Sequence, residues 1–270
     1  MIILRNKRKN FSLGLLIFRL ISLIIILICL ALLYNWNLEN NTNSELADNL
    51  SESFITGVTQ TTQVNPTDET SEENVNSSPS YETIEVNFQE LLNHNEQAVA
   101  WIKINNTNIN FPIVKGNDNS YYLTHNFDKK SNSAGWIFAD YTNNFDTLDK
   151  NTLIYGHNRR NNTMFSNLKY LLNPEWFNDN LNKYFIFNTK DHKYIAQIFS
   201  VYKINANSLL LSNSFENEEA FNQFITDCKQ KSIYNFDIEV PYEDNIITLC
   251  TCDNNTQYRI VVHAKLINVN

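Results

Sequence analysis

A cysteine and an arginine near the C-terminus have the types and spacing for nucleophilic catalysis. Cys252 ends the mostly apolar run 246–252, and Arg259 lies at the start of the apolar run 258–264. Two short apolar runs joined by a polar turn predict neighbouring buried strands. A nearby cation lowers the pKa of a thiol from ~8.5, and the thiolate is the nucleophilic form. The pair therefore predicts a cysteine nucleophile beside a guanidinium that stays charged at any working pH.

The proton transfers of such a reaction need a general acid and base, and His157 is the best candidate. It follows Gly156 directly after the apolar run 152–155, so we expect it at the rim of a sheet. A histidine in such a place can exchange protons as a general acid and base. Polar loops, a turn or packing within a strand account for the other histidines, which are His94, His125, His192 and His263.

Other residues of the cysteine strand have open roles. Cys250 is two positions from Cys252, so the two share a face of the strand and either thiol is a candidate nucleophile. Thr248 and Thr251 are candidates for shaping a substrate pocket. A Cys-x-Cys pair without a second ligand pair at the usual spacing is a poor zinc site, so no metal is expected.

These motifs resemble those of the sortases, the cysteine transpeptidases of Gram-positive cell surfaces. The resemblance rests on Thr-Leu-x-Thr-Cys at 248–252 with Arg259 after it, and on the upstream Tyr-Gly-His at 155–157. In the family pattern the position of Cys250 is the variable one, which identifies Cys252 as the nucleophile.

Further segments resemble class B sortases in particular. They are residues 108–114, residues 119–123 and a long helical insertion before the cysteine strand. The likeness extends from about residue 88 to residue 267.

The resemblance implies a mainly β fold. The expected architecture is a closed eight-stranded sortase-type β-barrel with N-terminal helices and a helical insertion before the catalytic strand. It also implies that the enzyme cleaves the C-terminal sorting signal of secreted proteins after Thr through a thioester on Cys252. The acyl group then passes to a peptidoglycan amine, with His157 transferring protons and Arg259 holding the oxyanion. This chemistry needs no cofactor.

Three other classes of protein remain as alternatives. A membrane-tethered cysteine peptidase would hydrolyse the thioester instead of transferring the acyl group. A thiol-disulfide protein would use Cys250 and Cys252, although the chain lacks a Cys-x-x-Cys motif. A non-catalytic barrel would bind the cell wall or a partner protein and would not need Cys252.

The N-terminus has the pattern of a signal anchor. Residues 1–10 form a basic tail, and residues 11–36 are nearly all apolar. About 20 residues of helix cross a bilayer, and no small-residue cleavage site follows the apolar run, so we expect an uncleaved single-pass anchor. The positive-inside rule places the N-terminus in the cytoplasm and the remaining chain outside the cell membrane. A net charge of −8 gives no reason to expect a nucleic-acid partner.

Composition divides the remaining chain into two parts. Residues 37–85 contain no Lys or Arg and are mostly Asn, Thr, Ser, Glu and Asp, which predicts a disordered acidic stalk. Its r.m.s. reach would be ~35–40 Å. Residues 86–270 are expected to form the catalytic domain.

Hydrophobic periodicity predicts most elements of that domain. Residues 102–104 and 109–111 alternate around four polar residues and predict a hairpin. An amphipathic helix is expected over 216–231, with Cys228 on its apolar face. The other expected strands are 135–139, 152–155, 184–187 and 194–204, and short helical turns are expected at 121–123 and 164–172.

Overall fold

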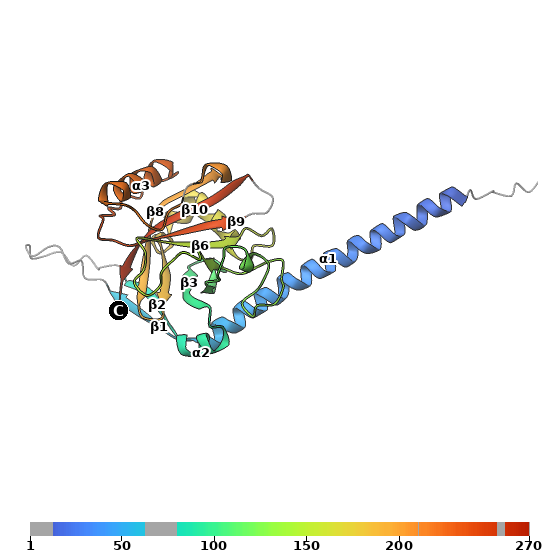
Figure 1. Cartoon of the computed structure of the whole chain (residues 1–270), viewed down its shortest axis with the longest axis horizontal. Coiled ribbons are helices and arrows are strands. Elements are labelled where there is room, and N and C mark those ends of the chain that lie inside the picture. The colour runs from blue at the N-terminus through green and yellow to red at the C-terminus, as the bar shows by residue number, and fades with distance from the viewer. Residues whose placement is uncertain (1–12, 63–79, 210, 253–256, 270) are drawn as a thin grey trace, which may run out of the picture.

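A computed structural model describes residues 13–62, 80–209, 211–252 and 257–269 of the chain. The predicted basic tail, residues 1–10, lies outside the described residues. Eight strands close into a barrel in the order β10-β8-β7-β3-β4-β5-β6-β9. Two neighbouring pairs, β4–β5 and β6–β9, are parallel, and the others are antiparallel. The predicted closed eight-stranded barrel is therefore confirmed (Figure 1).

The element bounds follow the expected pattern, except that the strand expected over 135–139 is confined to Phe138–Ala139. The barrel strands are β3 (Ala98–Ile104), β4 (Asn110–Val114), β5 (Phe138–Ala139), β6 (Asn151–His157), β7 (Tyr184–Thr189), β8 (Lys193–Asn205), β9 (Ile246–Cys252) and β10 (Tyr258–Asn268). The helices are α1 (Leu13–Phe54), α2 (Phe88–His94) and α3 (Glu218–Lys231). The 3-10 helices are η1 (Tyr121–Leu123), η2 (Phe165–Leu172), η3 (Pro174–Asn178), η4 (Asn180–Lys183) and η5 (Ala206–Ser208).

The barrel wall is apolar on both faces in the region of β8, β9 and β10. Ile154, Leu249 and Val262 point into the main core, as alternate strand residues do. On the opposite face, Cys250 and Val261 pack with Tyr202 beneath Leu209 and Leu211 of the segment after β8. Farther along that face, α3 covers the sheet with Phe221, Ile225 and Cys228. Cys228 is thus a core residue, and burial raises the pKa of its thiol to about 12.

The expectation of a disordered stalk over residues 37–85 is wrong for residues 37–62 and 80–85. Helix α1 continues through residue 54, and β1 (Ile55–Thr62) then pairs with β2 (Ser80–Val86) in an antiparallel sheet. Asn43, Ala47, Leu50 and Phe54 repeat at helical spacing and are buried on the barrel. This stripe is sparse, but tertiary burial overrides weak local propensity. Residues 63–79 lie outside the described residues.

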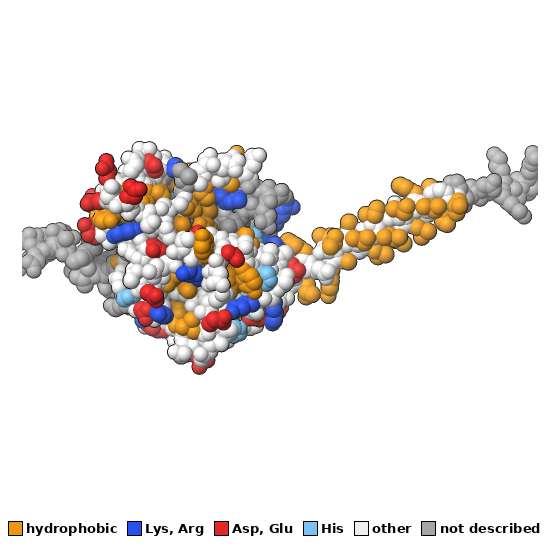
Figure 2. Space-filling view, in the orientation of Figure 1, with side chains coloured by type: hydrophobic (Ala, Val, Ile, Leu, Met, Phe, Trp, Pro, Cys, Tyr) orange, Lys and Arg blue, Asp and Glu red, His pale blue; other side chains and the backbone are white. Residues whose placement is uncertain are grey.

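The first half of α1 has the opposite character. Its apolar side chains, from Leu13 to Trp36, are exposed along the part of the helix that projects away from the barrel (Figure 2). An 18-residue window has a mean hydropathy of 3.1 and no buried residue. The helix is therefore long and apolar enough to cross a membrane.

A chain of polar side chains is buried in the wall between β6, β9, β10 and β8. The Thr248 hydroxyl donates to Asn151 Oδ1 at 2.8 Å, so it accepts from His263 Nδ1, also at 2.8 Å. His263 Nε2 then accepts from the Tyr202 hydroxyl at 3.0 Å. Burial, and then the charge of Lys231, lower the pKa of His263 to about 3. The ring is therefore neutral in the folded protein and fully hydrogen-bonded.

The depressed pKa of His263 predicts a loss of stability in acid. Between about pH 6.5 and pH 3, the unfolded chain binds a proton here and the folded chain does not. The free energy of unfolding therefore falls as pH falls through this window, by up to ~1.4 kcal/mol per pH unit from this group. His263→Gln should reduce that slope, measured by thermal unfolding of the full chain at several pH values. The exposed-histidine control His192→Gln should keep the parent slope, and equal slopes in all three proteins would contradict the assignment.

Gly156 is the other constrained position of the wall. A Cβ at this residue would lie 2.6 Å from Ile137 Cδ1 and 2.7 Å from Phe165 Cγ. Both neighbours are fully buried and cannot move aside. A glycine is thus required directly before His157, at the end of β6.

Gly156→Ala should destabilise the barrel by ~1–3 kcal/mol, because it overpacks a filled site. Gly57→Ala is the matched control, since its new Cβ would meet the Glu85 side chain at ordinary contact distances, 3.5 Å from Cγ and 3.8 Å from Cβ. Urea unfolding of the full-length variants measures the difference. Comparable losses in both variants would show that the close packing at Gly156 has no special weight.

Candidate active site

Three adjacent strands bring the predicted catalytic residues to one end of the barrel wall. The parallel strands β6 and β9 pair in register, and His157 is the Cα partner of Cys252. On the other side of β9, Val261 of β10 pairs with Cys250. Because these two strands are antiparallel, the residues before Val261 run beside the residues after Cys250. Arg259 therefore lies at the same end of the wall as Cys252. Segments separated by about a hundred residues thus converge at one rim.

The His157 ring is held in a defined orientation. The side chain is 4% exposed, and Nε2 lies 2.7 Å from the carbonyl oxygen of Leu123. A carbonyl only accepts, so Nε2 carries a proton in this contact. In the neutral ring, Nδ1 is then the nitrogen that is free to take up a proton. The contact with Leu123 therefore assigns proton exchange to Nδ1.

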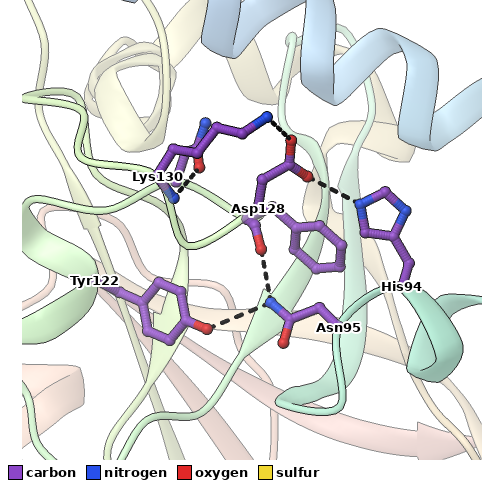
Figure 3. A network of polar contacts seen from close by, with 7 residues as sticks. His94, Asn95, Tyr122, Asp128 and Lys130 are labelled. Carbon is purple, nitrogen blue, oxygen red and sulfur yellow. Dashed lines mark hydrogen bonds and ion pairs between the residues drawn. The ribbon is translucent and has the colours of Figure 1, made fainter.

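A polar network fixes the segment that supplies this carbonyl (Figure 3). Next to Leu123, the Tyr122 hydroxyl accepts from Asn95 Nδ2 at 3.3 Å. The same amide donates to the carbonyl of Phe127 at 2.7 Å. Asp128 accepts from His94 at 2.9 Å and from Lys130 at 3.1 Å. Because His94 is the last residue of α2, this contact joins the segment to that helix. The Leu123 carbonyl, which binds His157, thus belongs to a segment that side-chain hydrogen bonds hold in place.

Arg259 lies at the start of β10. Its side chain is half-buried, and Nη1 donates to the carbonyl of Tyr258 at 3.2 Å. On its other side, Arg259 is the Cα partner of Ile204 in β8. The guanidinium is therefore carried by a strand that is paired on both sides, which suits a fixed charge.

The two threonines predicted near the pocket lie inside the wall. Thr248 belongs to the buried chain with His263, and the Thr251 hydroxyl accepts from the Ile260 amide at 2.9 Å. Both side chains have no exposed surface. Their role in shaping a substrate pocket stays a prediction, and any such effect would act through the position of β9.

Cys250 is similarly enclosed. It is 2% exposed and packs with Tyr202 and Val261. This burial separates it from solvent, whereas a nucleophile must meet its substrate.

A buried carboxylate next to β6 was not singled out from the sequence. Asp140 accepts from Tyr155, Asn119 and Thr142, at 3.0, 2.8 and 2.6 Å. Burial would raise the pKa of Asp140, but these hydrogen bonds outweigh it and hold the pKa below its usual range. The anion thus fixes Tyr155, two residues before His157. Only its place directly after an apolar run hinted at this role.

No group of three or more His, Cys, Asp and Glu residues is placed to hold a metal ion among the residues that the structure describes.

A cavity of about 400 Å³ lies at β2, β3 and β7, lined among others by Tyr81, Lys103 and Tyr184. Neither His157 nor Arg259 lines this cavity.

Comparison with known proteins agrees with this geometry. The sortase domain model matches residues 102–267. Sortase B of Staphylococcus aureus is 36% identical over 191 residues, which are 70% of this chain and 78% of that protein. A Staphylococcus aureus sortase B–substrate complex superposes with a TM-score of 0.65 at 36% identity, covering 68% of this chain and 85% of that one. A sortase B complexed with triglycine gives the same TM-score and identity, covering 68% of this chain and 86% of that one.

These matches confirm the resemblance to class B sortases that the motifs indicated. The extent of the match and the shared barrel show that the chain belongs to the sortase family of cysteine transpeptidases.

Proposed function

We propose that this sortase cleaves the C-terminal sorting signal of secreted proteins after Thr and transfers the acyl group to a peptidoglycan amine. The observation that carries the proposal is the register that pairs His157 with Cys252 at the end of β6 and β9. The neighbouring position of Arg259 on β10 supplies the third group. Related sortase B proteins have been solved with a substrate and with triglycine, which supports a peptide donor and an amine acceptor.

The first half-reaction forms the thioester. The Cys252 thiolate attacks the carbonyl carbon of the scissile peptide bond, and the oxygen takes up the negative charge. Arg259 donates hydrogen bonds to this oxyanion. Nδ1 of the His157 imidazolium then protonates the leaving nitrogen as the C–N bond breaks. Throughout, Nε2–H stays bonded to the Leu123 carbonyl, which stabilises the charged ring.

The second half-reaction reverses these roles. The incoming amine attacks the thioester carbonyl while Nδ1 of His157 takes its proton. The tetrahedral intermediate collapses, a new peptide bond forms and the Cys252 thiolate leaves. The same two groups therefore serve both halves, as microscopic reversibility requires.

The exposed apolar half of α1 supports a single-pass anchor in the cell membrane. We propose that residues 11–36 form this anchor, with the basic tail in the cytoplasm and the barrel outside. Both substrates of the reaction would be met on that outer side.

The reaction can be tested with the full-length chain in detergent micelles. Sorting-signal peptides are incubated with and without triglycine, and products are identified by mass spectrometry. Cleavage after Thr, with a product extended by triglycine, is the expected result, and release of only the free acid would favour a peptidase instead. Arg259→Ala should lower kcat/KM by ~10²–10³-fold, because one oxyanion donor is lost.

Matched cysteine variants identify the nucleophile. Cys252→Ala and His157→Gln should abolish transfer, whereas Cys250→Ala should retain it. Transfer that survives Cys252→Ala in a folded protein would refute the mechanism. The folded parent protein could also cleave none of the tested peptides while a thiol-reactive peptide analogue still traps Cys252. The correct sorting signal would then be one that the tested peptides do not include.

A further inference from the structure

The second half of the anchor helix lies against the loop that precedes β5. Asn43 Nδ2 donates to the carbonyl of Gly135 at 2.9 Å, and Asn132 Nδ2 donates to the carbonyl of Glu39 at 3.0 Å. The Glu39 carboxylate also accepts from the Ser133 amide, at 3.2 Å, and from the Ser133 hydroxyl. Asn43 has no exposed surface. The helix is thus joined to residues 132–135 by its side chains and its backbone.

Arg159 joins the same helix to the segment that follows His157. Its Nη2 donates to Asn40 Oδ1 and its Nη1 to the carbonyl of Ser133, both at 2.8 Å. The guanidinium carbon also lies 5.8 Å from the centre of the Trp36 ring. Burial lowers the pKa of Arg159, and the charge of Glu39 opposes this shift. Arg159 therefore ties the helix to a point two residues beyond His157.

The loop contacted by the helix is also bonded to the segment that holds the His157 ring. The Trp136 amide donates to the carbonyl of Tyr122 at 2.9 Å, and the Asn132 amide to that of Thr124 at 2.8 Å. Between these two carbonyls along the chain lies that of Leu123, the partner of His157 Nε2. Gly135 permits the approach, because its φ is +59° and an added Cβ would lie 2.4 Å from the Tyr122 oxygen.

Two routes therefore run from the anchor helix to one histidine. One passes through Arg159 to the backbone after His157, and the other passes through residues 132–136 to the carbonyl that orients the ring. Helix α1 is continuous from the exposed apolar half to this docked half. The end of the apolar half, at Trp36, is itself part of the contact with Arg159.

We propose that residues 36–43 of the anchor helix are a positioning element for His157, with Arg159 and Asn40 as its principal positioning residues. The inference rests on the proposed role of His157 as proton donor and acceptor. The membrane anchor is then part of the support of the active site and also holds the barrel at a fixed height above the bilayer.

The test uses the full-length chain in phospholipid nanodiscs and needs no sorting signal. Iodoacetamide alkylates thiolates, so the alkylation rate of Cys252 against pH reports its ionisation and that of its partner His157. Fragment ions in mass spectrometry distinguish Cys252 from Cys250. Asn40→Ala is the main variant, because it removes the contact with Arg159 without changing any charge. Arg159→Ala and Arg159→Lys accompany it, and thermal unfolding verifies that each variant is folded.

Ser51→Ala is the matched control. Ser51 accepts from Asn110 Nδ2 at 2.6 Å, so this variant also removes one bond between helix and barrel, but at the far end of the docked half. We expect Asn40→Ala and Arg159→Ala to change the Cys252 alkylation rate about 3- to 30-fold at neutral pH and to displace its pH profile. Arg159→Lys should lie between, and Ser51→Ala should match the parent. The double variant should resemble Arg159→Ala, because the loss of the guanidinium already removes the contact with Asn40.

Two outcomes would overturn the proposal, and they are distinguishable. Folded Asn40→Ala and Arg159→Ala proteins with the parent profile would show that the helix does not position His157, while the proposed function stands. A parent profile that His157→Gln leaves unchanged would remove the role of His157 itself, and the proposed function would fall with it. If Arg159→Ala does not fold, Asn40→Ala and Arg159→Lys decide the question.

Discussion

The active site depends on the parallel pairing of β6 with β9. The two strands are joined in register from Asn151 and Ile246 to His157 and Cys252. A slip of one residue would bring Thr251 beside His157 and reverse the faces of the strand. The register is fixed at the opposite end, where the Ile246 amide donates to the carbonyl of Lys150 at 2.9 Å and Thr248 binds Asn151. Polar contacts at one end of the strands thus help to determine which residues meet at the other.

This arrangement separates the residues that hold β9 in place from those that we propose to react. Thr248, Thr251 and Cys250 share the catalytic strand, yet all three are buried in the wall. The two threonines bind residues of the neighbouring strand β10. Cys250 packs with Tyr202 and Val261 on the outer face of the wall. The positions that we propose to react, His157 and Cys252, are the last pair of β6 and β9. A strand that ends at a rim can present a rigid backbone and an accessible side chain together, which catalysis by positioned groups requires.

Much of the barrel could be predicted from the sequence, because its strands are locally encoded. The hairpin of β3 and β4, the helix α3 and the strands β7 and β8 all follow apolar periodicity and polar turns. The order of the motifs along the chain predicted His157, Cys252 and Arg259 as the catalytic residues. Pairing between distant strands carries no local signal, so the register of β6 with β9 became visible only in the structure.

Other features were hidden for different physical reasons. The carbonyl of Leu123 has no side-chain signature, so no sequence pattern could identify it as the partner of His157. Asp140 is an ordinary acidic residue until the fold buries it beside Tyr155. The docked half of α1 has a polar composition typical of disorder, and its few apolar residues gain their meaning from the surface that receives them. Prediction thus fails where the partner of a residue is backbone or lies far along the chain.

The ordered second half of α1 bears on how a membrane anchor would hold the barrel. A flexible stalk would let the site sample a range of ~35–40 Å above the bilayer. In the structure, the polypeptide passes from the exposed apolar half of α1 into the docked half without a break. With α1 as the proposed anchor, the tilt of this one helix in the bilayer would set the orientation of the whole barrel. A site held this way loses reach, but it also avoids the entropic cost of ordering a tether each time a membrane-bound substrate arrives. For the membrane-surface substrates that we propose, the rigid connection is therefore the more favourable design.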